Sequence, residues 1–383
     1  MRFLLINYEY PPIGAGAATA TQAIAHKLTE LGHTVTVLTA RYHGLPEARM
    51  ESGVLVRRVR CLRRHPDRCT LLEMASFVLS AFFSLPFVMK VDRPNAGIAF
   101  FSIPCGPIAL MAKTLFGLPY VISLRGGDVP GLTPEVSRIH NLLRPLRHAV
   151  LENAIAIVAN ADGLRKLAET SDPFRVSVIP NGVDTEFFRP ITEPMNGSSH
   201  PFRIVFTGRF QAQKNVSLLL KECASLRDQS NVQFELHLVG DGPLRLELQA
   251  EAAHLGLSDR IVWHGWTPRD QLRGIYQASH CFVNPSFYEG MPNAVLEAMA
   301  CGKPIVASSV AGNDVIVQHG TTGFLFPLER PDLLRQSLKT LIDDPVRAQE
   351  MGWKGRNWVK SDFSWDYVAG AYAQLFGNHQ QAC

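Results

Sequence analysis

The chain has 383 residues, of which 46% are hydrophobic and 19% are charged, and its formal net charge is +4. This length exceeds what one hydrophobic core normally serves, so we expect a globular protein of two domains. The small net charge does not favour nucleic acid as a partner. The seven cysteines lack metal-ligand spacing, which favours reduced thiols in a cytoplasmic protein over a disulfide framework.

The N-terminal half begins with a strand, a loop and a helix. The apolar run "RFLLIN" is soon followed by Glu9, which predicts a buried strand and not a secretory signal. The loop "YPPIGAGAA" contains two prolines and two glycines. Apolar residues then recur at helical spacing up to Leu31, Gly32 ends the helix, and "HTVTVLTA" alternates as the next strand. This order predicts the start of a parallel sheet.

An apolar segment follows an arginine-rich one. "RRVRCLRR" (57–64) precedes "MASFVLSAFFSLPFVMKV" (74–91), which Pro86 and Lys90 interrupt. The segment is shorter than the roughly 20 residues that a membrane span needs. Two interpretations stay open: a core helix of the first domain, or a helix that lies on an anionic bilayer.

The second half repeats the same kind of unit. "FRIVFTG" predicts a strand, "RFQAQKN" a loop and "VSLLLKECASL" a helix, and further strands and helices alternate up to the strand "PIVAS". The sequence therefore predicts an α/β fold of two Rossmann-like doubly wound domains. The aperiodic stretch "RPITEPMNGSSHP" (189–201) marks the boundary, so we expect domains at 1–188 and 189–363. The end of the chain, "FSWDYVAGAYAQLF", predicts an amphipathic helix that packs on either domain.

The stretch "NPSFYEGMPNAVLEAMACGKPIVAS" (284–308) holds two glutamates with seven residues between them. In open α/β sheets, ligands lie beyond the C-terminal ends of the strands, where Glu289 follows a predicted strand. A helix that begins near Asn293 offers free N–H groups and its positive dipole end to a diphosphate. Glu297 lies about 6 Å along that helix, where it can accept hydrogen bonds from ribose hydroxyls. Glu289 then faces the group on the other side of the phosphates.

Two cations follow the first strand of the second half. Arg209 and Lys214 can neutralise a diphosphate leaving group, and the alternative is ordinary surface charge in a salt bridge. His264 and Trp266 follow another strand and can lie near a nucleotide base. For both, packing is the favoured interpretation.

These motifs resemble those of the retaining glycosyltransferases of family 4. The E-x7-E segment "EGMPNAVLE" with "AMACGKPIVAS" matches that family, as do "TGRFQAQKN", "LVGDGPL", "VIPNGVDTEFF" and "GTTGFLFP". "YPPIGAG" and "LTELGHTVTVLTA" also fit, so the resemblance covers nearly the whole chain. It implies the GT-B architecture, two Rossmann-like domains that face each other across a cleft, with the C-terminal helix (364–383) returning to the first domain.

The resemblance also implies transfer of a sugar from a nucleotide-sugar donor, with retention at the anomeric carbon. The donor site would lie mainly in the second domain and the acceptor site mainly in the first. By this resemblance Arg209 and Lys214 bind the diphosphate, Glu297 holds the ribose, and Glu289 contacts the donor sugar near the reacting carbon. The other donor-binding residues predicted in the second domain are Gly208, Gly290, Met291, Pro292, Asn293, Ala294 and Val295.

Two departures from the family pattern concern the first domain. The loop that closes over the phosphates reads Gly14-Ala15-Gly16-Ala17, whereas family members have paired glycines. In "SLRGGDVPG", Arg125 stands where many members have a histidine. Arginine cannot act as a base at neutral pH, so Arg125 is predicted to contact a donor hydroxyl, the phosphates or an anionic acceptor. Asp128 either binds an acceptor hydroxyl or stabilises a turn.

No D-x-D motif and no His/Cys ligand cluster occurs in the sequence, so we predict transfer without a metal or a bound cofactor. The donor is predicted as a UDP-sugar or GDP-mannose. The acceptor is predicted as a sugar or a lipid-linked molecule in surface polysaccharide or glycolipid assembly, at a cytoplasmic location that includes the inner face of the membrane. Three alternatives stay open: a nucleotide-sugar epimerase, a phosphorylase, and a nucleotide-sugar binding protein without catalysis.

Overall fold

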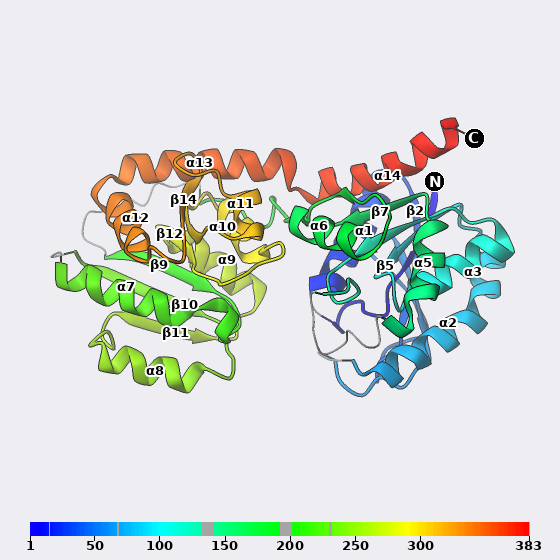
Figure 1. Cartoon of the computed structure of the whole chain (residues 1–383), viewed down its shortest axis with the longest axis horizontal. Coiled ribbons are helices and arrows are strands. Elements are labelled where there is room, and N and C mark those ends of the chain that lie inside the picture. The colour runs from blue at the N-terminus through cyan, green and yellow to red at the C-terminus, as the bar shows by residue number, and fades with distance from the viewer. Residues whose placement is uncertain (15, 67–68, 132–140, 192–200, 230–231, 383) are drawn as a thin grey trace. The chain divides into compact units, whose positions relative to one another are not determined.

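A computed structural model describes residues 1–14, 16–66, 69–131, 141–191, 201–229 and 232–382. The chain forms two compact units (Figure 1). Unit 1 comprises Met1–Asn181 with Trp365–Cys383, and unit 2 comprises Gly182–Ser364. The division falls a few residues before the predicted boundary at 188/189. Most of the predicted linker, residues 192–200, lies outside the described residues.

Unit 1 is built on a sheet with the strand order β3-β4-β2-β1-β5-β6-β7-β8 within the described residues. All neighbours pair in parallel except β3 and β4. The order reverses at β1, which pairs with β2 on one side and β5 on the other, so the sheet is doubly wound as predicted. The strands are β1 (Arg2–Ile6), β2 (Thr34–Ala40), β3 (Ala48–Glu51), β4 (Val54–Val59), β5 (Ala96–Phe100), β6 (Tyr120–Leu124), β7 (Ala156–Ala159) and β8 (Ser177–Val178).

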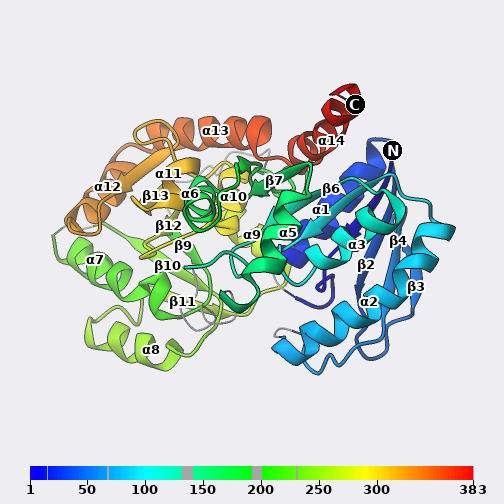
Figure 2. The same ribbon diagram turned by 45° about the vertical axis from the view of Figure 1, so that its right-hand side comes forward.

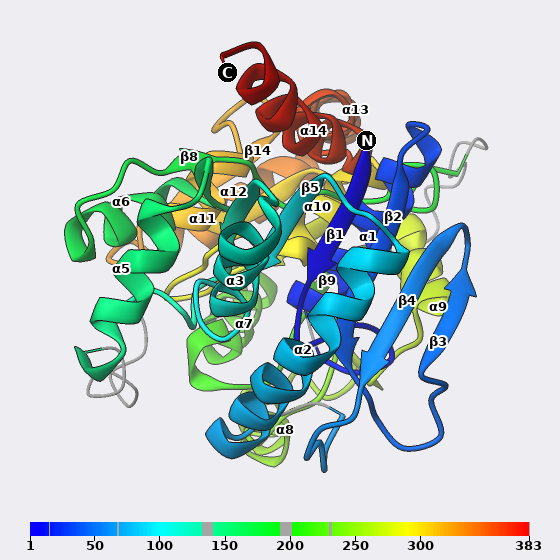
Figure 3. The same cartoon turned by 90° about the vertical axis from the view of Figure 1, so that its right-hand side faces the viewer.

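Helices cover this sheet, and the last helix of the chain is one of them. α14 lies beside α1 (Figure 3). Lys27 of α1 pairs with Asp366 of α14 at 3.1 Å. The Tyr372 hydroxyl of α14 lies 2.7 Å from Ser123 Oγ on β6, and both residues are buried. The C-terminal helix is therefore part of the core of unit 1. The helices are α1 (Gly16–Glu30), α2 (Leu71–Val91), α3 (Gly106–Phe116), α5 (Arg144–Glu152), α6 (Asp162–Ser171) and α14 (Trp365–Ala382).

The apolar segment 74–91 lies within α2. A capping box begins this helix, because the Thr70 side chain accepts from the Glu73 N–H while the Glu73 carboxylate accepts from the Thr70 N–H. Phe77, Ala81 and Leu85 are buried against the rest of unit 1. The core-helix interpretation therefore describes one side of α2.

Unit 2 has a second doubly wound sheet, parallel throughout, with the described strand order β11-β10-β9-β12-β13-β14. The strands are β9 (Phe202–Thr207), β10 (Phe234–Val239), β11 (Ile261–Gly265), β12 (Cys281–Asn284), β13 (Ile305–Ser308) and β14 (Gly323–Phe326). α7 packs against α8 and α12 along one side of this sheet (Figure 2). The helical elements are η2 (Ala212–Lys214), α7 (Val216–Gln229), α8 (Arg245–His254), α9 (Arg269–Ala278), α10 (Asn293–Ala300), α11 (Ala311–Ile316), α12 (Asp332–Asp343) and α13 (Pro345–Asp362).

The bond between α14 and β6 yields a prediction about stability. Tyr372→Phe leaves the buried Ser123 hydroxyl without its partner, so the free energy of unfolding should fall by about 1–2 kcal/mol. Urea denaturation measures this change, with Tyr288→Phe on the exposed Tyr288 as the matched control. Equal stability of Tyr372→Phe and the wild type would show that the hydroxyl pair does not hold α14.

Candidate functional site

The candidate site lies at the C-terminal edge of the unit 2 sheet. β9 and β12 are hydrogen-bonded neighbours, so the loops that follow them leave the sheet side by side. Two hydrogen bonds join these loops: the Phe287 N–H donates to the Gln213 carbonyl at 2.8 Å, and Gln213 Nε2 donates to the Tyr288 carbonyl at 2.8 Å. The loop that carries Arg209 and Lys214 is thereby tied to the loop that carries Glu289.

Lys214 and Glu289 form an ion pair. Lys214 Nζ lies 2.6 Å from Glu289 Oε1, and the two side chains are only 19% and 6% exposed. The sequence assigns these residues to adjacent parts of a ligand, the diphosphate and the donor sugar. Lys214 therefore forms the salt bridge that was the alternative interpretation for it. Its partner in that salt bridge is Glu289, which is itself a predicted site residue.

The Glu289 carboxylate is in contact with buried polar side chains. Ser286 Oγ lies 2.7 Å and Asn284 Nδ2 3.3 Å from the same oxygen, Oε1, that binds Lys214. Ser286 Oγ is also 2.8 Å from Asn284 Oδ1, so its single proton serves one acceptor at a time. Asn284 in turn donates to Asn313 Oδ1 at 2.9 Å. Oε2 accepts no hydrogen bond from the described residues, which leaves it for a ligand hydroxyl.

The turn after Glu289 depends on close backbone packing. A Cβ on Gly312, at the start of α11, would lie 2.5 Å from the Gly290 carbonyl and 2.9 Å from Glu289 Cβ, so a larger residue does not fit there. Met291 and Pro292 are buried, and α10 begins at Asn293 as predicted. Its N-cap residue, Pro292, gives no side-chain hydrogen bond to the helix. In the first turn, which includes Ala294 and Val295, the Val295 N–H already donates to the Pro292 carbonyl at 3.1 Å, so it is the helix dipole that favours an external anion such as a phosphate there.

The Arg209 side chain is exposed and forms no hydrogen bond or ion pair with the described residues, while the Arg209 carbonyl accepts from the Gln211 N–H at 2.9 Å. Its loop is nevertheless fixed, because Gly240 at the end of β10 has a φ of +128° and a Cβ there would lie 2.0 Å from the Gly208 carbonyl. Gly208 itself lies close to Lys214, since an added Cβ would meet Lys214 Cε at 3.6 Å. The salt-bridge alternative is thus not seen for Arg209, and its guanidinium suits an external anion.

Glu297, in α10, accepts a hydrogen bond from the Tyr276 hydroxyl of α9 at 3.1 Å. Part of the residue reaches solvent, but the carboxylate is surrounded by protein, and this burial raises the pKa of Glu297 to about 7. The hydrogen bond from Tyr276 opposes the rise in the pKa. Tyr276 was not among the residues predicted from the sequence. Its only signal is a tyrosine within the predicted helix "RDQLRGIYQAS", and the side chain is fully buried.

The site residues predicted in the first domain lie in unit 1. Gly14 has a φ of +91°, and a Cβ there would lie 2.6 Å from Glu9 Cβ and 2.9 Å from Ala18 Cβ. Gly16 is the first residue of α1, and Ala15 lies outside the described residues. The loop after β1 therefore requires glycine at position 14.

Arg125 follows β6 and is anchored within unit 1. Its Nη1 donates to Asn181 Oδ1 at 2.7 Å, and its guanidinium carbon lies 5.0 Å from the centre of the Phe100 ring. Its Nη2 lies 3.5 Å from the Tyr372 hydroxyl. The structure gives Arg125 these structural contacts, and its catalytic role stays a prediction.

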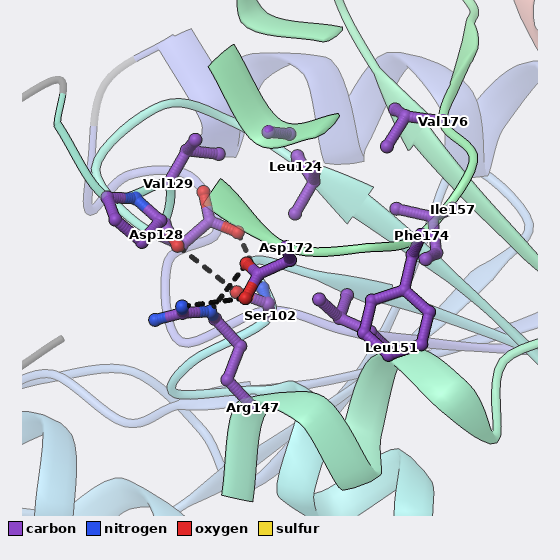
Figure 4. Close-up of a pocket in the computed structure, with 12 residues that line it drawn as sticks. Ser102, Leu124, Asp128, Val129, Arg147, Leu151, Ile157, Asp172, Phe174 and Val176 are labelled. Carbon is purple, nitrogen blue, oxygen red and sulfur yellow. Dashed lines mark hydrogen bonds and ion pairs between the residues drawn. The ribbon is translucent and has the colours of Figure 1, made fainter. Parts of the chain in front are cut away.

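Asp128 is buried and serves as a local acceptor for the backbone (Figure 4). Its Oδ2 accepts from the Ser102 N–H at 2.6 Å, and its Oδ1 accepts from the N–H groups of Arg125 and Gly126 at 3.0 and 3.1 Å. Burial raises the pKa of Asp128, and these N–H donors oppose the rise. These contacts fit the turn-stabilising interpretation, and the acceptor role of Asp128 stays a prediction.

His264 and Trp266 differ from one another. His264 Nε2 lies 2.9 Å from His237 Nδ1, and the two rings stack, so His264 is packed as predicted. The packing prediction for Trp266 is wrong, because its side chain is 79% exposed. It follows β11, an edge strand of the unit 2 sheet, where no further strand covers it.

The part of the chain that the structure describes contains no cluster of three or more His, Cys, Asp or Glu side chains suited to a metal ion. Transfer without a metal stays a prediction. The six described cysteines are free thiols.

The raised pKa of Glu297 predicts a pH-dependent contribution to stability. Between pH 4.5 and 7 the folded protein keeps a proton that the unfolded chain has released, so rising pH lowers the free energy of unfolding. Relative to Glu297→Gln, the wild type should lose up to about 3 kcal/mol of stability across this range. Urea denaturation of both proteins at several pH values measures the difference. If the difference in free energy of unfolding between the wild type and Glu297→Gln does not change with pH, the raised pKa of a buried Glu297 carboxylate is contradicted.

Comparison with known proteins gives a consistent family assignment. Residues 191–358 match the family model described as glycosyl transferases group 1, and residues 15–182 match the glycosyl transferase 4-like domain. An alpha-maltose-1-phosphate synthase of Mycobacterium tuberculosis is 33% identical over 290 residues, which cover 68% of this chain and 73% of the relative.

Two further similarities concern part of the chain and the fold. A UDP-Gal:alpha-D-GlcNAc-diphosphoundecaprenol alpha-1,3-galactosyltransferase of Escherichia coli is 36% identical over 185 residues, which cover 46% of this chain and 47% of the relative. The solved structure of sucrose-phosphate synthase from Thermosynechococcus elongatus superposes with a TM-score of 0.80 at 20% identity, over 100% of both chains. The superposition shows that the fold is GT-B.

Proposed function

Because the chain belongs to the group 1 glycosyltransferases, of the family 4 type, we propose that it transfers a hexose-type sugar from a nucleotide-sugar donor to a hydroxyl acceptor with retention at the anomeric carbon. The observation that carries this proposal is the Lys214–Glu289 ion pair at the C-terminal edge of the unit 2 sheet, on the same loop as the unpaired Arg209. Together they offer two cations and one fixed carboxylate to a sugar diphosphate.

The donor is proposed to lie along this edge in one line. Its diphosphate contacts Arg209, Lys214 and the first turn of α10, where the N–H groups and the helix dipole favour an anion. Glu297 accepts hydrogen bonds from the ribose, and Oε2 of Glu289 accepts one from the sugar. We propose a UDP-sugar first and GDP-mannose second. The E. coli relative, whose name specifies UDP-Gal, supports this order.

In the proposed reaction, the bond between the anomeric carbon and the phosphate oxygen breaks, and its electron pair passes to that oxygen. The acceptor oxygen forms its bond to carbon on the same face, and its proton passes to the departing phosphate oxygen. Lys214 and Arg209 stabilise the charge that develops on the leaving group, without a metal ion. Three contacts to Oε1 of Glu289 favour a hydrogen-bonding role for this carboxylate over that of a nucleophile.

The acceptor is proposed as a sugar or lipid-linked molecule in surface polysaccharide or glycolipid assembly. Support comes from the E. coli relative, whose name specifies a diphosphoundecaprenol-linked acceptor. A reaction on such an acceptor takes place in the cytoplasm at the inner face of the membrane.

Two alternatives predict different products. An epimerase would convert a nucleotide sugar with no acceptor present, and a binding protein would release no nucleotide. Membership of the group 1 glycosyltransferases favours transfer over both alternatives, and the pairing of Glu289 with Lys214 suits the binding of a sugar diphosphate.

Nucleotide release from UDP-glucose, UDP-galactose and GDP-mannose, measured in EDTA with sugar and lipid-linked acceptors, tests this function. Glu289→Gln and Lys214→Met should each lower kcat/KM by at least about a hundredfold, because each removes a charge that the transition state requires. Arg330→Met, on a surface arginine of unit 2 that pairs with Asp332, is the matched control.

The anomeric configuration of the product, determined by NMR, tests retention. An inverted product would overturn the retaining mechanism, and release of nucleotide only after addition of a divalent metal would overturn the metal-free one. Conversion of the donor without an acceptor would favour the epimerase.

A further inference from the structure

α2 carries two apolar stripes on opposite sides. At about 3.6 residues per turn, Phe77, Ala81, Leu85 and Val88 share one side, and all four are buried in unit 1. The opposite side presents Leu72, Leu79, Phe83, Phe87 and Lys90, at intervals of seven, four, four and three residues. We call these five residues the α2 outer stripe.

The α2 outer stripe is open to solvent within unit 1. Leu72 and Phe83 are 78% and 79% exposed, and Leu79 and Phe87 are also more than half exposed. Helix α3, which packs against α2, ends with two further exposed apolar side chains, Leu115 and Phe116. Exposed apolar side chains gathered along one side of a helix mark a surface that meets a partner.

α2 is long and apolar enough to cross a membrane by length and composition. It does not do so in this fold, because its other stripe packs into the core of unit 1. A helix with one buried side and one apolar outer side can only approach a bilayer lying in its plane.

The charge of this region favours an anionic surface. Residues 48–116 contain ten arginines and lysines against four aspartates and glutamates, a net charge of +6, whereas the whole chain carries +4. The three carboxylates in the described part of this segment are already engaged. Glu51 pairs with Arg58, Asp92 pairs with Arg57, and Glu73 forms the capping box.

Unpaired cations stand at both ends of α2. Arg64 lies at its start, where its backbone N–H donates to the Glu73 carboxylate. Lys90 and Arg93 lie at its end, and the side chains of all three are exposed with no ion pair to the described residues. Arg57, which is paired with Asp92, also lies beside the stripe, since its guanidinium carbon lies 5.1 Å from the centre of the Phe87 ring.

We infer that the α2 outer stripe docks in the plane of an anionic lipid bilayer, with Leu72, Leu79 and Phe83 among the acyl chains and the flanking cations on the headgroups. A lysine at the end of such a stripe extends its amine to the headgroups while its methylenes stay in apolar contact. The inference goes beyond the proposed transfer reaction, because binding to a bilayer requires neither donor nor acceptor.

Co-sedimentation of the full chain with lipid vesicles tests the inference, without nucleotide sugar present. Vesicles that contain phosphatidylglycerol should bind the wild type, and vesicles of phosphatidylcholine alone should bind it at least tenfold more weakly. Leu79→Ser/Phe83→Ser should weaken binding to the anionic vesicles at least about tenfold. Arg64→Gln/Lys90→Gln, which leaves the apolar side chains in place, should weaken it roughly tenfold or more.

Leu246→Ser, on α8 of unit 2, is the matched control because Leu246 is as exposed as Leu72, and it should bind as the wild type does. Wild-type binding by Leu79→Ser/Phe83→Ser, or no binding of the wild type to anionic vesicles, would overturn the inference.

A second copy of the chain is the alternative occupant of the α2 outer stripe. It would be assigned if the wild type did not bind vesicles and light scattering showed a wild-type dimer that is lost in Leu79→Ser/Phe83→Ser. The wild type and Leu79→Ser/Phe83→Ser should turn over a soluble acceptor at equal rates. This measurement separates a loss of membrane binding from a loss of the proposed transfer reaction.

Discussion

The ion pair between Lys214 and Glu289 is the interaction on which the candidate site depends. The two residues are 75 positions apart in the chain, and they meet because β9 and β12 are neighbours in the unit 2 sheet. A charge pair that is mostly shielded from water is stable only when hydrogen bonds satisfy its remaining groups. Ser286 and Asn284 supply those bonds to Glu289, so the carboxylate is fixed before any ligand arrives.

The loops around this pair are held by backbone contacts that exclude a side chain. Gly312 brings α11 against the turn after Glu289, and Gly240 brings the end of β10 against the loop of Arg209. The same loops leave two side-chain groups without partners in the described chain, the Arg209 guanidinium and Oε2 of Glu289. Rigid loops with unpaired groups are what a preorganised site for a charged ligand requires.

The sequence predicts the elements better than it predicts the contacts. Alternation of strands and helices is enough to derive two doubly wound sheets, and the start of α10 at Asn293 follows from Pro292 and the apolar run. The partners of Glu289 and the hydroxyl of Tyr276 were missed, because they meet the site only through tertiary packing. For Asp128 the sequence left an acceptor contact and a turn-stabilising role open, because its three backbone donors are set by the folded loop, which no residue spacing reveals. Trp266 was expected to pack, but the edge position of β11 leaves it exposed.

The most direct test of the central claim is calorimetric titration of UDP, in EDTA, into the wild type and Arg209→Met, with uridine as the phosphate-free reference. The Arg209 side chain forms no hydrogen bond or ion pair with the described residues, so Arg209→Met breaks no such bond within unit 2. The account predicts that UDP binds the wild type and that Arg209→Met weakens this binding about 10- to 100-fold, with uridine unaffected. Failure of UDP, GDP and ADP alike to bind, or equal affinity of the variant for UDP, would contradict a diphosphate site at this edge.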